Sequence, residues 1–307
     1  MNTSRLPPLG LIAGPTASGK SALAIAVAER IGGTIVNADA SQVYRDLRIL
    51  TARPSAEDEA RVPHLLFGHI DAGVAHNAAV WAAEARRAIA AVHGGGGVPI
   101  LVGGTGLYIQ TLLLGLAPVP AIDPAIREAV RALPVAEAHA ALACEDAAAA
   151  ARLRATDTTR VARALEVVRS TGRTLAEWQE ERAGGIEGEV RLSPLVMMPP
   201  AATLASAIDA RFEAMIGAGA GAEVDALLAR RLDASLPAMR AIGVRELAAW
   251  RRGERSRTDA IADAQAASRR YAKRQRTWFR NQNATWEDSN IDEVRSAISF
   301  LSHRLTR

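Results

Sequence analysis

The chain has 307 residues, of which 49% are hydrophobic and 23% are charged, so its composition excludes a disordered or fibrous protein. Its one cysteine, Cys144, excludes an internal disulfide and a cysteine zinc cluster. This usage is typical of a reducing compartment, and we expect a cytoplasmic protein. The 37 basic and 33 acidic residues give a net charge of +4, and Lys20 and Lys273 are the only lysines.

The first elements form a strand, a loop and a helix. Pro7 and Pro8 stand where a secretion signal would need an apolar run, so we predict no such signal. The apolar run Leu9–Ala13 predicts a strand, Gly14–Ser21 predicts a loop, and Ala22–Arg30 has the composition of a helix. The loop therefore lies between a strand end and a helix start.

Two further strands follow. Thr34–Ala38 is a β-branched run that ends at Asp39, and Val98–Val102 ends in glycines, with a predicted helix over Ala78–Val92 between them. The stretch Val98–Ile122 carries no charge, but its glycines and prolines argue against a spanning helix. We expect no membrane association.

Beyond Pro118 the pattern changes from alternating to helical. Asp123–Glu181 is rich in Ala and Arg and predicts helices without a strand, whereas Val190–Met198 predicts a strand that returns to the sheet. Ala201–Arg307 is mostly helical in composition. We therefore predict a core domain over residues 1–118 and 190–307 with a helical C-terminal part, and a helical insertion domain over residues 119–189.

The strongest local signal is the loop, which matches the phosphate-binding pattern G-x-x-x-x-G-K-[ST] in full. Backbone N–H groups at a helix start favour phosphate oxygens, the lysine would contact the terminal phosphates, and the following serine would hold Mg²⁺. A chance match in a glycine-containing turn is the alternative. The candidate diphosphate- or nucleotide-binding residues are Gly14, Pro15, Thr16, Ala17, Ser18, Gly19, Lys20 and Ser21, with Ser21 as the metal ligand.

Alternating strands and helices around this loop predict the fold. We expect an α/β protein with a P-loop NTPase-like parallel sheet flanked by helices and an all-helical insertion domain. Right-handed crossovers place the carboxyl ends of parallel strands at one edge. Asp39 and the turn Gly103-Gly104-Thr105 would then share that edge with Lys20.

Two residues at this edge are candidates for catalysis. The run Ile100–Val102 ends in glycines and not in the acid that an ATPase needs, so the loop is suited to a diphosphate that leaves. Asp39 is placed to act as a general base, and its alternatives are a helix N-cap or an outer contact of Mg²⁺. Thr105 could donate a hydrogen bond to a ligand, or the turn could simply need glycines with positive φ.

A basic block lies near the C-terminus. The segment from Arg240 to Arg280 has a charge of +8, so the remainder is −4, and this asymmetry suggests a polyanionic partner or a solvated helix surface. Tyr271 and Trp278 are seven residues apart on one helical face among the cations, an arrangement that suits RNA or an aromatic core anchor. The six histidines, including His64, are scattered and show no metal spacing.

Several motifs together resemble the tRNA dimethylallyltransferases, or isopentenyl-diphosphate:tRNA transferases. They occur in the order of that family and cover most of the chain from Gly14 to Arg280. The matching stretches are Gly14–Ser21, Asp39–Tyr44, Thr51–Pro54, Leu101–Tyr108, Asp157–Val167, Arg240–Glu246 and Ala272–Trp278.

The resemblance implies transfer of a dimethylallyl group from its diphosphate to N6 of the adenosine 3′ of the anticodon, tRNA position 37, with Mg²⁺ as cofactor. It implies that Asp39 takes the proton from the amine, that Lys20 neutralises the leaving group, that Thr105 lies near the substrate base and that Arg211 lies near the diphosphate. By the same match, the tRNA anticodon stem-loop would contact Asp39, Ala40, Ser41, Gln42, Thr105, Arg127, Thr159, Arg160, Val161, Ala162, Arg163, Arg240, Ala241, Ile242, Gly243, Val244, Arg245, Lys273 and Arg274.

Three positions depart from the family pattern. Ala40 replaces a serine whose hydroxyl could orient the catalytic carboxylate, and the neighbouring Ser41 is a possible substitute. Arg53 and Ala207 replace a lysine and an arginine. The competing hypotheses are a P-loop small-molecule kinase, a non-catalytic RNA-binding protein, and a relative that prenylates free adenine nucleotides. Nothing in the sequence requires a dimer, and we expect a monomer.

Overall fold

The computed structural model describes residues 6–282, 286 and 294–306. The chain divides into an α/β unit, formed by the residues up to Leu112 and those from Ile186 on, and a helical unit, Leu113–Gly185. The predicted domain bounds of 118/119 and 189/190 stay a prediction beside this division. The sequence expectations for residues 1–5, and for helix over residues 283–285, 287–293 and 307, lie outside the described residues.

The α/β unit is built on a five-stranded parallel sheet with the strand order β3-β2-β4-β1-β5, which confirms the predicted fold class. Ile12 in β1 lies opposite Val102 in β4 and Leu195 in β5, so the central strand joins segments that are distant in sequence. The predicted strands correspond to β1 (Pro8–Ala13), β2 (Thr34–Asn37), β4 (Pro99–Gly103) and β5 (Arg191–Val196), whereas the two-residue edge strand β3 (His64–Leu65) is too short for a sequence pattern.

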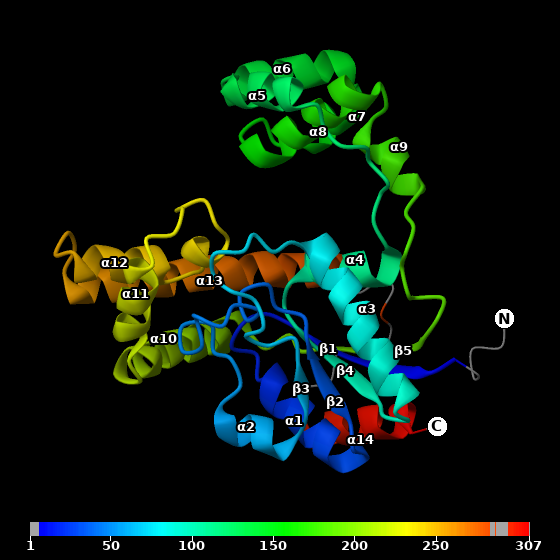
Figure 1. The fold of residues 1–307 in the computed structure, drawn as a ribbon, viewed down its shortest axis with the longest axis vertical. Helices are drawn as coiled ribbons and strands as arrows, with labels where there is room; N and C mark the ends of the chain where they lie inside the picture. Colours follow the sequence, from blue (N-terminus) through cyan, green and yellow to red (C-terminus); the bar gives the residue numbers. More distant parts are fainter. Residues whose placement is uncertain (1–5, 283–285, 287–293, 307) are drawn as a thin grey trace. The chain divides into compact units, whose positions relative to one another are not determined.

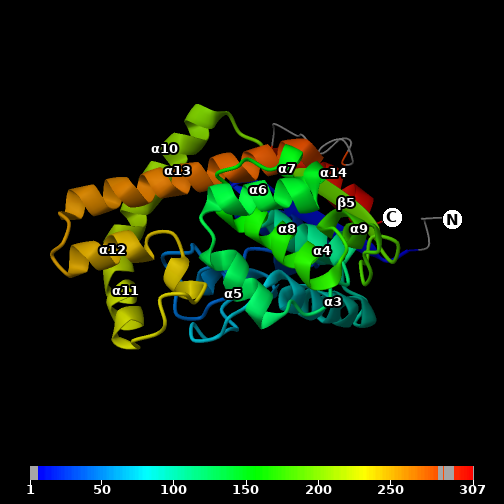
Figure 2. The ribbon, with the colours of Figure 1, turned by 90° about the horizontal axis from the view of Figure 1, so that it is seen from above.

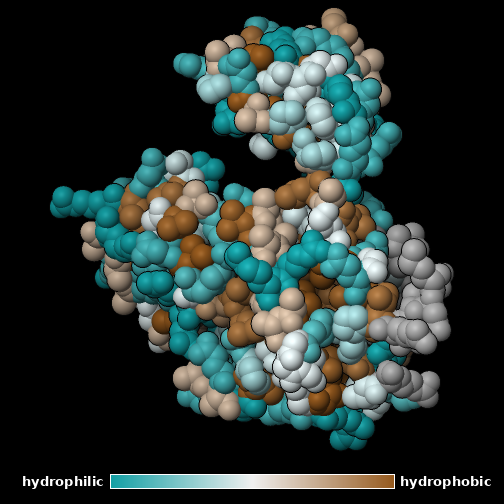
Figure 3. Space-filling model, turned by 45° about the vertical axis from the view of Figure 1, so that its right-hand side comes forward, coloured by the Kyte–Doolittle hydropathy of each residue, from teal (hydrophilic) through white to brown (hydrophobic). Residues whose placement is uncertain are grey.

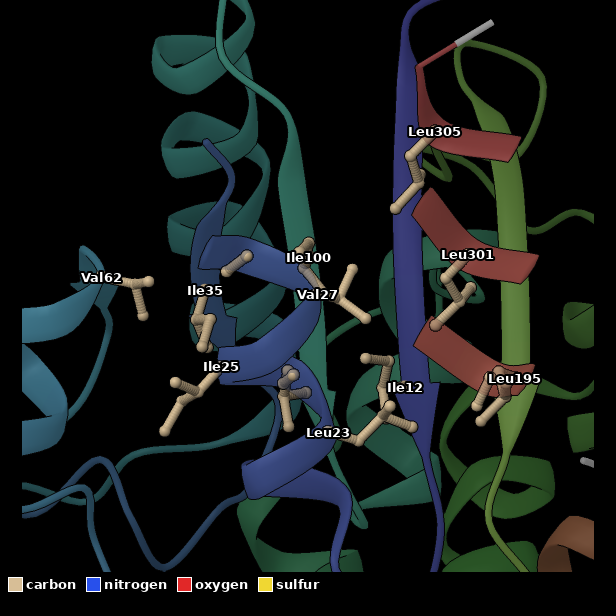
Figure 4. Close-up of a cluster of buried hydrophobic side chains, with 14 residues drawn as sticks. Ile12, Leu23, Ile25, Val27, Ile35, Val62, Ile100, Leu195, Leu301 and Leu305 are labelled. Atoms are coloured by element: carbon tan, nitrogen blue, oxygen red, sulfur yellow. The ribbon is translucent and has the colours of Figure 1, made fainter. Parts of the chain in front are cut away.

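Helices cover both faces of the sheet (Figure 1). Helix α1 (Lys20–Ile31) and α14 (Val294–Leu305) lie on one face, where Leu23, Val27 and Leu301 are buried against the strands (Figure 4). Helix α3 (Ala78–Gly94) packs on β2 and β4, and the short helix α2 (Ala56–Arg61) contacts α1. Because β1 and β4 are covered on both sides, they are buried along nearly their whole length, as a parallel sheet requires.

Four helices pack together beside the sheet in both ribbon views (Figures 1 and 2). They follow β5 in the chain and include the long helix that carries the basic block. A 3₁₀ turn over Ala238–Arg240 precedes the third of them. Their bounds are Ala201–Gly217 (α10), Ala220–Ala229 (α11), Val244–Arg251 (α12) and Arg257–Gln282 (α13).

The helical unit has a core of its own. Val161 and Leu165 of α8 pack with Val130 of α5 and Leu142 of α6, so each amphipathic helix buries its apolar face against the others. An antiparallel bridge between Leu116 and Ala183 joins the two chain segments that enter and leave the unit. The helices are α5 (Pro124–Ala132), α6 (Val135–Glu145), α7 (Ala147–Arg152), α8 (Thr158–Thr171) and α9 (Leu175–Glu180).

The face that Figure 3 presents is mixed, with hydrophilic residues interspersed with hydrophobic patches. Within the described ranges, no helix combines the length and the apolar character that crossing a bilayer requires. Helix α4 (Gly106–Leu114) is the most apolar part of the uncharged stretch that followed β4 in the sequence, and its nine residues are too few for a span.

Candidate active site

The predicted phosphate loop joins β1 to α1, as the sequence pattern required. Gly14 and Gly19 have φ values of 150° and 86°, and a Cβ on Gly14 would lie 2.5 Å from the Met197 carbonyl oxygen, so only glycine suits that turn. Lys20 is the first residue of α1, and its Nζ donates to the Pro15 carbonyl at 3.2 Å. The Ser18 hydroxyl is buried without a hydrogen-bond partner among the described residues, which leaves it available to a ligand in the loop.

A pocket of about 650 Å³ opens over this loop. Its wall brings the segment Thr16–Ala22 together with Asp39–Gln42, which follows β2, and with Arg211 of α10. The 3₁₀ turn contributes Arg240, the segment between it and α12 contributes Ala241 and Ile242, and α13 contributes Tyr271 and Arg274. The sequence prediction that Asp39 and Lys20 share one sheet edge is therefore correct.

Asp39 is held by a tight turn at the end of β2. Its Oδ1 accepts hydrogen bonds from the Ser41 backbone N–H at 2.9 Å and from the Ser41 hydroxyl at 2.7 Å, while Oδ2 has no hydrogen-bond partner among the described residues. Ser41 thus supplies the hydroxyl that Ala40 lacks. No helix begins at Asp39, so the N-cap alternative is wrong. The structure leaves one carboxylate oxygen for a proton or a metal-bound water.

Asn37 is a residue that sequence reasoning missed. It is fully buried at the end of β2, where its Nδ2 donates to the Asp39 carbonyl at 3.0 Å and to the Leu66 carbonyl at 2.9 Å. Its Oδ1 accepts from the Asp39 backbone N–H at 2.8 Å. A buried amide with all three bonds satisfied fixes the backbone that carries the carboxylate. The only available signal was a polar residue at the end of an apolar strand.

Thr105 lies against the same turn. Its hydroxyl accepts from the Ala40 backbone N–H at 3.0 Å, and its own N–H donates to the Ala38 carbonyl at 3.2 Å. A Cβ on Gly103 would come within 2.2 Å of the Ala38 carbonyl, so glycine is needed for this close approach. Gly103, Gly104 and Gly106 do not have positive φ, so the alternative of a turn built on positive φ is wrong. The Thr105 side chain also faces Tyr271, and its hydrogen bond to that hydroxyl opposes the rise in the pKa of Tyr271 that burial causes.

The pocket wall carries more cationic than anionic side chains. Burial lowers the pKa of Lys20 to about 8, the Asp39 carboxylate opposes that shift, and the Arg211 guanidinium adds to it. Burial also lowers the pKa of Arg211, which donates to the Thr16 hydroxyl. Neither side chain forms an ion pair with a carboxylate within the described part of the chain. Two such cations favour a bound polyanion, whose charge would raise the pKa of the lysine again.

Helix α13 carries core residues, a residue of the pocket wall and a residue of a second, smaller pocket. Phe279 is fully buried and Trp278 packs over Gly106, so both are core anchors. Tyr271 differs, because it lines the pocket, where burial raises the pKa of its hydroxyl. Lys273 does not line this pocket but a smaller one of about 300 Å³ between α10 and α13.

The remaining predicted tRNA contacts fall in two places. In the α/β unit, Gly243 starts α12 with φ of 95°, Val244 is buried, and Arg245 is exposed. In the helical unit, α5 carries the exposed Arg127, and α8 carries Thr159, Arg160, Val161, Ala162 and Arg163. Val161 is fully buried in the core of that unit, so its side chain stabilises the helix that presents its neighbours.

One cluster contradicts the expectation that the histidines are scattered. The Nε2 atoms of His69 and His76 lie 3.0 and 3.1 Å from Glu84 Oε2, and His76 Nδ1 lies 3.2 Å from the Tyr108 hydroxyl. Burial would raise the pKa of Glu84, but the hydrogen bonds from the two histidines outweigh it and lower that pKa. A loop and a helix supply the three residues, so sequence spacing could not reveal them.

Comparisons with known proteins identify the family of this chain. Residues 42–282 match the family described as IPP transferase. A protein named tRNA dimethylallyltransferase from Sphingopyxis alaskensis is 62% identical over 306 residues, which cover 97% of this chain and 100% of that protein. A protein of the same name from Zymomonas mobilis is 54% identical, with 96% of each chain covered.

Solved structures of tRNA prenyltransferases also match this chain over most of its length. A full-length tRNA isopentenylpyrophosphate transferase from Bacillus halodurans matches with a TM-score of 0.69 and 29% identity, over 97% of each chain. A eukaryotic dimethylallyltransferase acting on tRNA matches with a TM-score of 0.75 and 26% identity, over 89% of this chain and 70% of that one. With a phosphate loop, a carboxylate at the neighbouring strand end and relatives that match nearly end to end, this chain belongs to the IPP transferase family.

Proposed function

We propose that this enzyme transfers a dimethylallyl group from dimethylallyl diphosphate to N6 of the adenosine at tRNA position 37 and releases diphosphate. The observation that carries the proposal is the single pocket that Lys20, Arg211 and Asp39 share. Cations on one wall suit the diphosphate, and a carboxylate on another suits an amine that must lose a proton. The names of the relatives supply the chemical class.

The first requirement of the proposed reaction is that the diphosphate can depart from the dimethylallyl group. The bond between the allylic C1 and the diphosphate oxygen breaks more easily when the charge that develops on the leaving oxygens is neutralised. The loop amides, the Ser18 hydroxyl, Lys20 and Arg211 are the groups available for that. Since neither cation has a carboxylate partner in the part of the chain that the structure describes, no ion pair there has to be broken when the diphosphate binds.

Mg²⁺ is compatible with the residues present. The Ser21 hydroxyl lines the pocket at the start of α1, and the free oxygen of Asp39 lies on the same wall, so the donors are the hard oxygens that Mg²⁺ prefers. We propose Ser21 as its protein ligand, with the diphosphate supplying further oxygens. When bound, Mg²⁺ would neutralise charge on the leaving group.

Asp39 is the proposed base. As the bond between N6 and C1 forms, the amine becomes cationic and passes a proton to the carboxylate, so charge and atoms balance without another reactant. The two hydrogen bonds from Ser41 fix Oδ1, which leaves Oδ2 to receive the proton. The Thr105 hydroxyl, which accepts from the Ala40 N–H and faces Tyr271, is the proposed neighbour of the adenine ring.

A tRNA substrate suits the charge distribution. Arg240 and Arg274 reach the pocket from the basic block of charge +8, and neutral adenosine alone would not require such a block. A free nucleotide substrate predicts binding that depends weakly on salt, whereas tRNA predicts a steep dependence. The P-loop kinase alternative is not favoured, because β4 ends in Gly103-Gly104 and because family membership points elsewhere. A monomeric, cytoplasmic protein remains our expectation.

The test is direct. The protein is incubated with dimethylallyl diphosphate, Mg²⁺ and unmodified tRNA, and the digested nucleosides are analysed by mass. We expect one adenosine per tRNA to gain a dimethylallyl group, with one diphosphate released per transfer. ATP replaces the allylic diphosphate in a parallel reaction. The proposal would be refuted in favour of a kinase if the reaction with ATP transferred phosphate and the reaction with dimethylallyl diphosphate gave no prenylated nucleoside.

A further inference from the structure

A buried glutamine connects the phosphate loop to the turn that carries Thr105. Gln275 lies on α13 and is only 5% exposed. Its Oε1 accepts from the Thr16 backbone N–H at 2.8 Å, and its Nε2 donates to the Gly104 carbonyl at 2.8 Å. The first of these contacts spans 259 positions in the sequence. The phosphate loop and the Thr105 turn leave the neighbouring strands β1 and β4 at the paired residues Ala13 and Gly103, and the Gln275 side chain bridges them beyond the strand ends.

The surroundings are shaped for this amide. A Cβ on Gly104 would lie 2.2 Å from Gln275 Nε2 and 2.7 Å from the Gly14 carbonyl, so glycine at position 104 makes room for the contact. Thr16 is held from both sides, because its amide is bound by Gln275 and its hydroxyl by Arg211. Since the Thr16 N–H is engaged, it is not among the amides free to receive a phosphate oxygen. Gln275 thus also selects which loop amides face the ligand.

We propose that Gln275 is a positioning residue for the transfer reaction. It sets the phosphate loop at a fixed distance from Thr105 and Asp39, and so sets the distance between the departing diphosphate and the base that accepts the proton. This inference rests on the proposed function. Displacements of about 1 Å in such a constellation can lower turnover about 100-fold.

The test compares two glutamines of one helix. Gln275→Met removes both hydrogen bonds at similar volume, and Gln265→Met, on the same helix but bonded only to the Asp209 carbonyl, is the control. We expect Gln275→Met to lower kcat/KM for dimethylallyl diphosphate about 10- to 100-fold and to weaken calorimetric binding of inorganic diphosphate, at temperatures where both variants are folded. The control should resemble the wild type.

A folded Gln275→Met protein with wild-type kcat/KM and diphosphate affinity would overturn the inference. If this variant does not fold, Gln275→Glu is measured instead, because it keeps an acceptor for Thr16 but turns an oxygen toward the Gly104 carbonyl. Unchanged kinetics there overturn the inference equally. A wild-type protein that binds no diphosphate would instead refute the proposed function, so the two failures are distinguishable.

A second, independent observation concerns the cluster of His69, His76 and Glu84. Their nitrogen and carboxylate ligand atoms all lie within 4.8 Å of one another. A tetrahedral ion with bonds of about 2.0–2.1 Å holds its ligands roughly 3.3 Å apart, which is close to the observed 3.0 and 3.1 Å between histidine nitrogens and carboxylate oxygen. We infer that the cluster is a site for a divalent cation of the zinc class.

The neighbours support binding. His76 has a side chain 1% exposed, whereas His69 and Glu84 are 28% and 18% exposed, so an ion and a water can enter from the His69 side. To bind a metal through Nε2, His76 must carry its proton on Nδ1, where the Tyr108 hydroxyl can accept it. Such an outer hydrogen bond orients the imidazole of a metal-bound histidine.

Cobalt serves as the spectroscopic probe. The full-length protein is titrated with Co²⁺ and, by calorimetry, with Zn²⁺, for the wild type, Glu84→Gln and the control His64→Gln. We expect one equivalent to bind with visible absorption bands, a loss of affinity of about 10-fold or more in Glu84→Gln, and no change in the control. No binding by the wild type, or equal binding by Glu84→Gln, would show that the cluster is a hydrogen-bond network alone.

Discussion

Two charged sites, one in the α/β unit and one in the helical unit, differ in whether their side chains are paired with an opposite charge. In the helical unit, Glu166 is 2% exposed and its carboxylate is paired with Arg131 at 2.8 Å and Arg163 at 4.0 Å. In the α/β unit, Lys20 and Arg211 lie in a pocket where burial lowers both pKa values and no carboxylate pairs with them among the described residues. A buried charge with a partner holds a structure together, whereas one without a partner is available to a ligand.

The glycines show the same difference. Gly103, Gly104 and Gly106 allow backbone, amide and indole groups to approach within distances that a Cβ would prevent. In the helical unit, Gly172 has φ of 69° and nothing near its Cβ position, so it only ends α8. The first three glycines build the site, whereas Gly172 ends a helix. The predictions below test whether this division between functional and structural features holds.

The largest effect is expected at the carboxylate of the site. Asp39→Asn keeps the size of the side chain and one carbonyl acceptor for Ser41, but it removes the proton acceptor. We expect kcat to fall by roughly two to four powers of ten, with little change in the unfolding midpoint. Single-turnover measurement of prenylated tRNA checks the rate. The matched control is Asp71→Asn, an exposed carboxylate paired with Arg230, which should retain the wild-type rate.

The paired charge of the helical unit should behave in the opposite manner. Glu166→Ala removes the carboxylate that Arg131 and Arg163 contact, and leaves a small cavity in a packed unit. We expect the free energy of unfolding of that unit to fall by about 1–3 kcal/mol, since the arginines are exposed enough to hydrate. Hydrogen exchange of α8 amides measures the change. We expect the affinity for inorganic diphosphate, measured by calorimetry, to be unaltered. A loss of that affinity would contradict the contrast between the two sites.

The sequence was sufficient for features that depend on local pattern. The apolar runs predicted β1, β2, β4 and β5, and the spacing from Gly14 to Ser21 predicted the loop, because both depend on neighbouring residues only. It was not sufficient for Asn37 and Gln275. Their hydrogen bonds join segments brought together by strand order and helix packing, and a lone amide in a sequence carries no sign of such a partner.

The histidine cluster was missed for a related reason. His69 and His76 flank a loop and Glu84 lies on α3, so their approach depends on how that helix packs on the sheet. Conversely, the prediction for Thr105 named the residue but gave a wrong alternative for its glycines. Pattern alone cannot separate a positive φ from a close approach, because glycine permits both.

A smaller effect is expected at Ser41, which orients the base without reacting. Ser41→Ala removes the 2.7 Å hydrogen bond to Asp39 Oδ1 and keeps the bond from the backbone N–H at 2.9 Å. A hydrogen bond to a charged group contributes about 1.5–3 kcal/mol, and half of this turn remains, so we expect kcat to fall about 10-fold. The control is the double variant Ala40→Ser/Ser41→Ala, whose kcat is measured in the same way. Rescue by the hydroxyl at position 40 would show that orientation is the role, and no loss in the single variant would contradict it.

The smallest effect concerns stability at the unpaired lysine. Lys20→Met should abolish diphosphate binding yet raise the free energy of unfolding of the ligand-free protein by about 1 kcal/mol at pH 7, because the substitution removes a desolvated cation that has no carboxylate partner among the described residues. The sign follows from the pKa of Lys20, which is about 8 in the folded protein and 10.5 for an ordinary, solvated lysine. Below pH 8 both states are protonated and the penalty is fully present. Between pH 8 and 10.5 the folded state releases its proton first, so the wild type gains stability with rising pH and the difference from Lys20→Met shrinks.

Chemical denaturation of both proteins from pH 7 to 10 measures this difference. A constant gap, or a variant less stable than the wild type, would mean that Lys20 is a structural charge like Glu166, and the contrast between the two units would fail at the residue on which it most depends.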